Sequence, residues 1–277
     1  MKKIYDFSRT SAERNYTIKD LQELKGSDRK LSMANPANAA ELRACLEAGI
    51  DLLVVWDSQI EEVRQITPTH FAGVGSTWVQ FSQAHEIVDH AFDMMRKGGD
   101  LYYTLRSYDV MEMLAREGIP VQSHIGLIPT FSHYTGMRGF GRTADEAMEI
   151  YKTLKRMEDV GVVAVEAECI AEEVLEAVNQ KTSIVTFSLG SGKAGDVIMS
   201  FVADVCGEPS EEAKPPKHAY AFGNVGRLHA QIHQERVAAL GKFHAEVTAK
   251  NFPYPETNIG MHKNEKEKFF EALDKAT

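Results

Sequence analysis

Several features that would place the chain in a special class are missing from its 277 residues. Only three cysteines occur, an odd number at wide separations and without a CxxC pair: Cys45, Cys169 and Cys206. This spacing argues against a disulfide framework or a zinc site, and it favours a reducing compartment. The first residues carry charges but no apolar stretch typical of a signal peptide. No apolar run approaches the roughly 18 residues of a membrane-spanning helix, so we expect a cytoplasmic protein.

Positive charge is also scarce. The chain carries 31 basic and 40 acidic side chains, a net charge of -9, and no long run of Lys or Arg concentrates positive potential. Nucleic acid and membrane surfaces are therefore not expected partners. Hydrophobic residues make up 43% of the composition and charged residues 26%, as in ordinary folded proteins. A large core can therefore form without disulfide or metal support.

Short apolar runs alternate with longer segments of helical period. This pattern is typical of parallel strands joined by crossover helices, and several helical segments end in glycine, as helix C-termini prefer. The predicted strands are residues 31–34, 51–55, 70–74, 101–105, 120–123, 162–165 and 183–187. Repeated βα units allow either an open doubly wound sheet or a closed barrel, and periodicity alone does not decide between them.

Polar residues that follow apolar runs are the candidates for chemistry, because catalytic groups in parallel α/β folds gather at the C-terminal ends of strands. Asp57 and Ser58 follow LLVVW, and His124 follows PVQS. Glu166 and Glu168 follow VVAV, and the glycine-rich SLGSGKAG follows SIVTF. These are the positions at which we look for a site.

Each candidate also has an ordinary structural explanation. An aspartate after a strand is more often a helix N-cap than a ligand, and a lone histidine is more often structural. Glycines after a strand usually form a turn, although their N–H groups can hold an anion. Glu166 and Glu168 are two positions apart, so they share one face of a strand. Burial together would raise one carboxyl pKa, which suits proton transfer, whereas exposure at the strand end would cancel this effect.

Four motifs occur in an order and spacing that resemble the ketopantoate hydroxymethyltransferase family. They are IPVQSHIGLIP (119–129), GMRGFGR (136–142), AVEAECIAEEV (164–174) and SIVTFSLGSG (183–192). Typical members read IPVMGHIGLTPQ, GGYRVQGR, AVVLECVPAEL and IPTIGIGAG. YTIKDLQELKG, AGIDLLVVWDS and FHAEVTAKNFPYPE are similar to further family segments, so the resemblance covers about residues 16–257.

The resemblance implies an eight-stranded βα (TIM) barrel of the phosphoenolpyruvate mutase and isocitrate lyase superfamily, with a C-terminal helical extension, in a homo-oligomer. It implies a transferase of pantothenate biosynthesis that adds a hydroxymethyl unit from methylenetetrahydrofolate to a small 2-oxo acid such as 3-methyl-2-oxobutanoate. In the family, a magnesium ion holds the 2-oxo acid and stabilises its enolate. By position, Asp57 matches a metal-ligand aspartate, Ser58 a substrate contact, His124 the active-site histidine, and Glu168 the glutamate assigned to proton transfer.

The sequence departs from the family pattern around the metal. The family has a second metal-ligand aspartate after its third strand, but THFAGVGST contains no carboxylate. The family's fourth strand carries Lys-x-Glu, and here Tyr103 matches the Lys and Leu105 the Glu. The segment between Ser58 and Thr69 is also much shorter than usual.

These departures make Asp57 a poor magnesium site by itself, because a hard cation prefers several oxygen ligands. His124, Arg106 or Tyr103 could instead polarise the keto acid and bind the substrate. Arg106 can hold a carboxylate bidentately, although arginines at such positions more often lie on the surface.

We predict one βα-barrel domain, with the barrel at residues 16–207 and a linker and helices at 208–277. Within this second part, helices at 227–250 and 263–276 follow a polar, proline-bearing segment. Two other functions remain open: a lyase, hydrolase or mutase acting on another 2-oxo acid or a phosphonate without the usual metal site, and a catalytically silent barrel that binds a metabolite. The presence of Asp57, His124 and Glu168 argues against the silent barrel.

Overall fold

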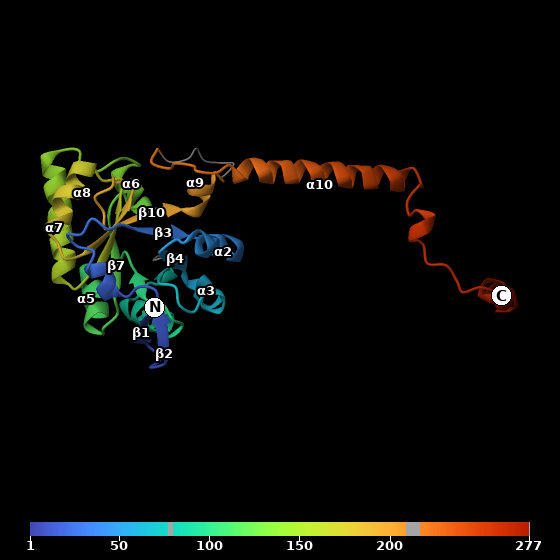
Figure 1. Ribbon diagram of the computed structural model, residues 1–277, viewed down its shortest axis with the longest axis horizontal. Coiled ribbons are helices and arrows are strands. Elements are labelled where there is room, and N and C mark those ends of the chain that lie inside the picture. The colour runs from blue at the N-terminus through green and yellow to red at the C-terminus, as the bar shows by residue number, and fades with distance from the viewer. Residues whose placement is uncertain (77–79, 209–216, 277) are drawn as a thin grey trace. The chain divides into compact units, whose positions relative to one another are not determined.

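A computed structural model of the chain describes residues 1–76, 80–208 and 217–276 (Figure 1). It divides into two compact units, Met1–Gly223 and Asn224–Thr277, which we call the barrel unit and the C-terminal unit. Each is described by itself below. The one-domain assignment stays a prediction.

Eight parallel strands close into a barrel in the order β10-β3-β4-β5-β6-β7-β8-β9. The strands are β3 (Leu31–Asn35), β4 (Leu52–Trp56), β5 (Ala72–Gly75), β6 (Leu101–Tyr103), β7 (Val121–Gly126), β8 (Ala164–Glu168), β9 (Val185–Leu189) and β10 (Val197–Phe201). Each of the seven predicted segments overlaps one of them, and the predicted closed barrel is confirmed. The sequence prediction missed β10, which pairs with β3 and completes the ring.

Helices lie outside the strands, as Figure 1 shows. They are α1 (Ile18–Gln22), α2 (Ala39–Ala48), α3 (Ile60–Ile66), α4 (Ala84–Arg96), α5 (Tyr108–Arg116), α6 (Ser132–Thr135), α7 (Ala144–Asp159), α8 (Glu172–Asn179) and α9 (Val202–Cys206), with short 3-10 turns η1 (Asp57–Gln59) and η3 (Pro129–Phe131). Local signals set several of their ends. The Asn38 side chain accepts hydrogen bonds at the start of α2, and Gly49 ends that helix in the left-handed conformation.

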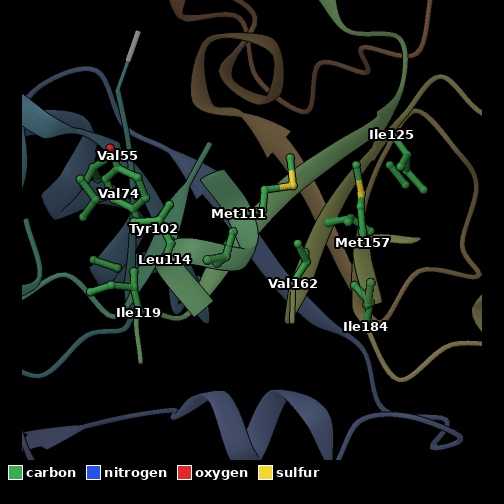
Figure 2. Close-up of a cluster of buried hydrophobic side chains, with 14 of the residues drawn as sticks. Val55, Val74, Tyr102, Met111, Leu114, Ile119, Ile125, Met157, Val162 and Ile184 are labelled. Atoms are coloured by element: carbon green, nitrogen blue, oxygen red, sulfur yellow. The ribbon is translucent and has the colours of Figure 1, made fainter. Parts of the chain in front are cut away.

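Most strand residues are buried, which explains why several strands, such as β4 with LLVVW, are short apolar runs. One layer of side chains lies between the strands and the helices. Figure 2 shows part of it, with Val55, Val74 and Tyr102 from three neighbouring strands and Leu114 from α5. A second cluster fills the barrel interior, where Leu21 of α1 packs with strand residues from several sides. The barrel interior is therefore a packed core.

The connection from β9 to β10 contains no helix, because only residues 190–196 join these two parallel strands. Ile198 of β10 points outward and is 39% exposed as a result.

A short antiparallel hairpin precedes the barrel, formed by β1 (Lys2–Tyr5) and β2 (Ser11–Arg14). Arg14 fastens it to the barrel through Asp100, with Nε 2.7 Å from Oδ1. Arg64 donates to the other carboxylate oxygen, also at 2.7 Å. Because the two arginines share one nearly buried carboxylate, an ion-pair network joins the hairpin to the barrel.

The C-terminal unit contains α10 (Val225–Thr248), the turn η4 (Pro255–Thr257) and α11 (Glu265–Ala276). These helices confirm the two predicted in this part of the sequence, and most of their described side chains are exposed. Among all the helices that the structure describes, none is long and apolar enough to cross a membrane.

Candidate active site

The C-terminal ends of the barrel strands surround a cavity of about 220 Å³. Six strands contribute their last residue, and β7 contributes His124. The lining residues are Asn35, Val54, Val55, Trp56, Gly75, Tyr103, His124, Pro129, Glu166, Glu168, Met199 and Phe201. This is the end at which parallel barrels carry their active sites. None of these described lining residues is a lysine or an arginine.

Alternation along the strands decides which side chains enter the cavity. In β8, Glu166 and Glu168 line it, while Val165 and Ala167 pack in the layer beneath the helices. In the pairing of β7 with β8, His124 lies opposite Glu166. The two carboxyls and the imidazole are therefore directed into one space by strand geometry alone.

His124 is 3% exposed and lies between a tyrosine and a carboxyl. Its Nδ1 is 2.9 Å from the Tyr103 hydroxyl, and its Nε2 is 3.4 Å from Oε2 of Glu168. Burial lowers the pKa of His124 to about 4, so the imidazole is neutral and its contact with Glu168 is not an ion pair. If Tyr103 donates to Nδ1, the proton on the neutral ring lies at Nε2 and faces Glu168.

The two glutamates are buried, and no lysine or arginine is among the described residues that line the cavity with them. Glu166 is 7% and Glu168 9% exposed. Burial raises the pKa of Glu166 to about 8, and the charge of Glu168 adds to this effect. Burial alone raises the pKa of Glu168 to about 7. Near neutral pH, Glu166 is therefore mostly a neutral acid, and Glu168 is divided between its acid and carboxylate forms.

His124, Glu166 and Glu168 each offer one potential ligand atom, and these atoms lie within 4.8 Å of one another. One nitrogen and two oxygens in a largely apolar cavity do not match the oxygen shell that magnesium prefers. The cluster is also not at the family's metal position, which corresponds to Asp57.

Asp57 is engaged elsewhere. Its Oδ2 lies 3.3 Å from Nε2 of His90, which comes from α4, and its Oδ1 accepts a hydrogen bond from the Ser58 N–H at 2.7 Å. The other ring nitrogen of His90 is 2.9 Å from the Tyr102 hydroxyl. A single carboxylate held by an imidazole does not fit a magnesium ion, and we derive no step through that metal.

The structure places the predicted site residues in two groups. Tyr103, His124 and Glu168 meet in the cavity. Asp57, Ser58 and Arg106 are not among its described lining residues. Ser58 is exposed, and the Arg106 guanidinium donates to the backbone carbonyls of Phe81 and Ser82 at 3.1 and 3.5 Å. The predicted roles of Asp57, Ser58 and Arg106 in substrate or metal binding stay predictions.

Some lining residues were not anticipated. Asn35 and Trp56 each end a strand, so their position was a usable signal. Met199 and Phe201 belong to β10, the strand that the sequence prediction missed.

The chain is similar in sequence to known enzymes of one family. Residues 77–255 match the family model for ketopantoate hydroxymethyltransferase. The chain belongs to this family. A 3-methyl-2-oxobutanoate hydroxymethyltransferase of Anaeromyxobacter sp. (strain Fw109-5) is 25% identical over 89% of this chain and 88% of its own length. A 3-methyl-2-oxobutanoate hydroxymethyltransferase of Cenarchaeum symbiosum (strain A) is 31% identical over 57% of this chain and 57% of its own length.

Among solved structures, a putative phosphonomutase from Burkholderia cenocepacia J2315 has a TM-score of 0.52 and 11% identity, covering 82% of this chain and 99% of that chain. This likeness concerns the fold alone. The identities of the two hydroxymethyltransferase relatives, 25% and 31%, are low. In the motif resemblance noted above, AVEAEC of this chain matches AVVLEC, which sets Glu166 against an apolar residue.

Proposed function

We propose that the protein transfers a hydroxymethyl unit to a small 2-oxo acid, such as 3-methyl-2-oxobutanoate, through an enolate, with methylenetetrahydrofolate as the one-carbon donor. Membership of the ketopantoate hydroxymethyltransferase family supports this reaction class. One observation carries the proposal: His124 and Glu168, which match the family's motif positions, meet at 3.4 Å in a cavity at the strand ends.

The cavity suits a small, branched substrate. Its volume of about 220 Å³ is below the range of roughly 300–1,000 Å³ typical of larger ligands. Val54, Val55 and Met199 supply apolar walls that can contact an isopropyl group. Tyr103 supplies a polar group for the keto acid end.

Glu168 is the proposed base. Its carboxylate takes the proton from C3 of the 2-oxo acid, and the C–H electron pair forms the C2–C3 double bond while the keto oxygen gains negative charge. Water releases the one-carbon unit from methylenetetrahydrofolate as formaldehyde: both C–N bonds of the methylene group break, and the two folate nitrogens keep the electron pairs and leave as tetrahydrofolate. The enolate carbon then bonds to the formaldehyde carbon, the C=O electron pair moves to oxygen, and that oxygen takes the proton held by Glu168 to become the hydroxyl group. A base whose pKa is about 7 is well matched to this task near neutral pH. The His124 imidazole lies beside the Glu168 carboxyl, with Nε2 3.4 Å from Oε2, and the Tyr103 hydroxyl bonds to its other ring nitrogen.

Replacing Glu168 by Gln tests the proposal. The amide keeps the shape of the side chain but cannot accept the proton, so we expect turnover of 3-methyl-2-oxobutanoate to fall at least about 100-fold. Product formation is measured by chromatography, and circular dichroism checks that the fold is kept. Glu173→Gln, at an exposed position of α8, is the matched control and should behave as the wild type.

Wild-type turnover by Glu168→Gln would contradict the proposed role of Glu168. Turnover of a phosphonate or a dicarboxylate, with no reaction of any 2-oxo acid, would instead favour the lyase or mutase alternative.

We also propose that the protein acts in the cytoplasm as a homo-oligomer, as the family resemblance implies. Light scattering coupled to size-exclusion chromatography tests the assembly, and a monomeric mass at micromolar concentration would contradict it.

A further inference from the structure

Glu166 is a buried ionisable group that the proposed reaction leaves without a role. The motif resemblance matches it to an apolar residue, yet it lines the same cavity as the proposed base. It precedes Glu168 by two positions in β8 and shares its face, and it lies opposite His124 across the strand pair. Burying a carboxyl here lowers the stability of the fold, whereas an apolar side chain could be buried without loss of hydration. We therefore look for a functional reason for the carboxyl.

The surroundings of Glu166 favour its neutral form. An ionised carboxylate that is almost completely buried needs a cation or several hydrogen-bond donors to offset its lost hydration. The described lining of the cavity contains no lysine and no arginine, and His124 is itself buried and neutral. Glu168 is a second acidic group within reach. A bound 2-oxo acid, which carries its own negative charge, would add to the repulsion of a charged Glu166.

The reaction also needs a group that stabilises the keto oxygen, and the described lining of the cavity offers no lysine or arginine for this task. Negative charge develops on the keto oxygen as C3 loses its proton, and a hydrogen-bond donor or a cation aimed at that oxygen stabilises it. The metal position of the family is not available for this, because Asp57 contacts His90. A neutral carboxylic acid in an apolar site can act as such a donor.

We propose that Glu166, as a neutral carboxylic acid, donates a hydrogen bond to the keto oxygen of the bound 2-oxo acid and performs the task that a metal ion performs elsewhere in the family. Glu168 removes the C3 proton while the Glu166 O–H group stabilises the oxygen, so a donor and an acceptor of one strand act on the two ends of the O–C2–C3 unit that becomes the enolate. This inference rests on the proposed function and assigns the residue that makes enolate formation independent of a bound cation.

The test measures enolate formation without the folate step. The protein is treated with EDTA and desalted, and its metal content is checked by mass spectrometry. Exchange of the C3 proton of 3-methyl-2-oxobutanoate is then followed by NMR in D₂O for the wild type, Glu166→Val, Glu166→Gln and the exposed control Glu173→Gln. Valine is close to the family residue and fits a buried strand, and glutamine keeps an N–H donor.

We expect the metal-free wild type and Glu173→Gln to exchange the proton at equal rates. Glu166→Val should be about 100-fold to 1,000-fold slower, the usual effect of removing one donor to a developing oxyanion. Glu166→Gln should lie between the two. A second readout is independent of activity: the infrared C=O stretch of a protonated carboxyl at pH 7 should be present in the wild type and reduced in Glu166→Val.

Two results would overturn the inference and leave the proposed function intact: exchange by Glu166→Val at the wild-type rate, or loss of exchange on EDTA treatment with recovery on adding magnesium, manganese or zinc. If the wild type exchanges no 2-oxo acid with or without added metal, the proposed function fails, and this inference fails with it.

Discussion

The carboxyl of Glu166 should make the protein less stable as the pH rises, and replacing it by Gln should remove that dependence. The pKa of this group is raised from 4.5 to about 8 in the folded protein. Between these two values the unfolded chain has lost the proton while the folded chain still holds it. The folded state therefore loses free energy relative to the unfolded state as the pH rises from 4.5 to 8, and no such loss occurs below this window.

The size of the effect follows from the two pKa values. The free energy of unfolding falls by about 1.4 kcal/mol for each pH unit between them, so Glu166 lowers it by roughly 3–4 kcal/mol between pH 5 and pH 8. Since the side chain is almost completely buried, little of this is lost to screening by solvent. A glutamine at this position does not titrate, so the effect of its buried amide on the free energy of unfolding is the same at pH 5 and pH 8.

Urea unfolding followed by far-ultraviolet circular dichroism at pH 5, 6, 7 and 8 measures this effect. The wild type is compared with Glu166→Gln, and Glu173→Gln serves as the exposed control. The advantage of Glu166→Gln over the wild type should grow by about 3 kcal/mol from pH 5 to pH 8, while the control follows the wild type. A constant difference across the pH range would refute the reasoning, because it would mean that Glu166 is ionised at pH 5 in the folded protein.

Two further substitutions probe the support around the site. Gly126 has φ +89°, and a Cβ there would lie 2.2 Å from the backbone oxygen of Glu168. We therefore expect Gly126→Ala to lower the free energy of unfolding, measured in urea, by about 2–4 kcal/mol and to reduce turnover. A decrease below about 1 kcal/mol would contradict this placement of Gly126. The Asp100 side chain is 10% exposed and pairs with Arg14 and Arg64. Asp100→Asn leaves two nearly buried guanidinium groups without their counter-charge, so we expect the free energy of unfolding to fall by about 3–5 kcal/mol. An unchanged urea midpoint would show that this ion-pair network contributes nothing to stability.

The βα pattern was predictable from the sequence because short apolar runs alternate with segments of helical period, and the motif resemblance implied the closed barrel. β10 was missed since its VIMSF run follows the glycine-rich SLGSGKAG without the helix that normally separates two strands. The hairpin at residues 2–14 was missed for a different reason. Its strands, KKIY and SAER, are polar, and Arg14 is buried only because Asp100 and Arg64, far away in the chain, meet it in the fold.

The site was predictable in part. The family motifs identified His124 and Glu168, and the spacing of Glu166 and Glu168 predicted a shared face. The partner of Asp57 could not be predicted, because His90 reaches it from α4 through tertiary packing. Likewise, no local signal indicates that Arg106 donates to backbone carbonyls of the segment before α4.

The most direct test of the account is a crystal structure of the wild-type protein soaked with 3-methyl-2-oxobutanoate. We predict the acid in the cavity at the strand ends, with its keto oxygen within hydrogen-bond distance of the Glu166 carboxyl and its C3 carbon facing Glu168. Density for the acid beside Asp57 and Arg106, with the cavity around His124 free of it, would contradict the central claim.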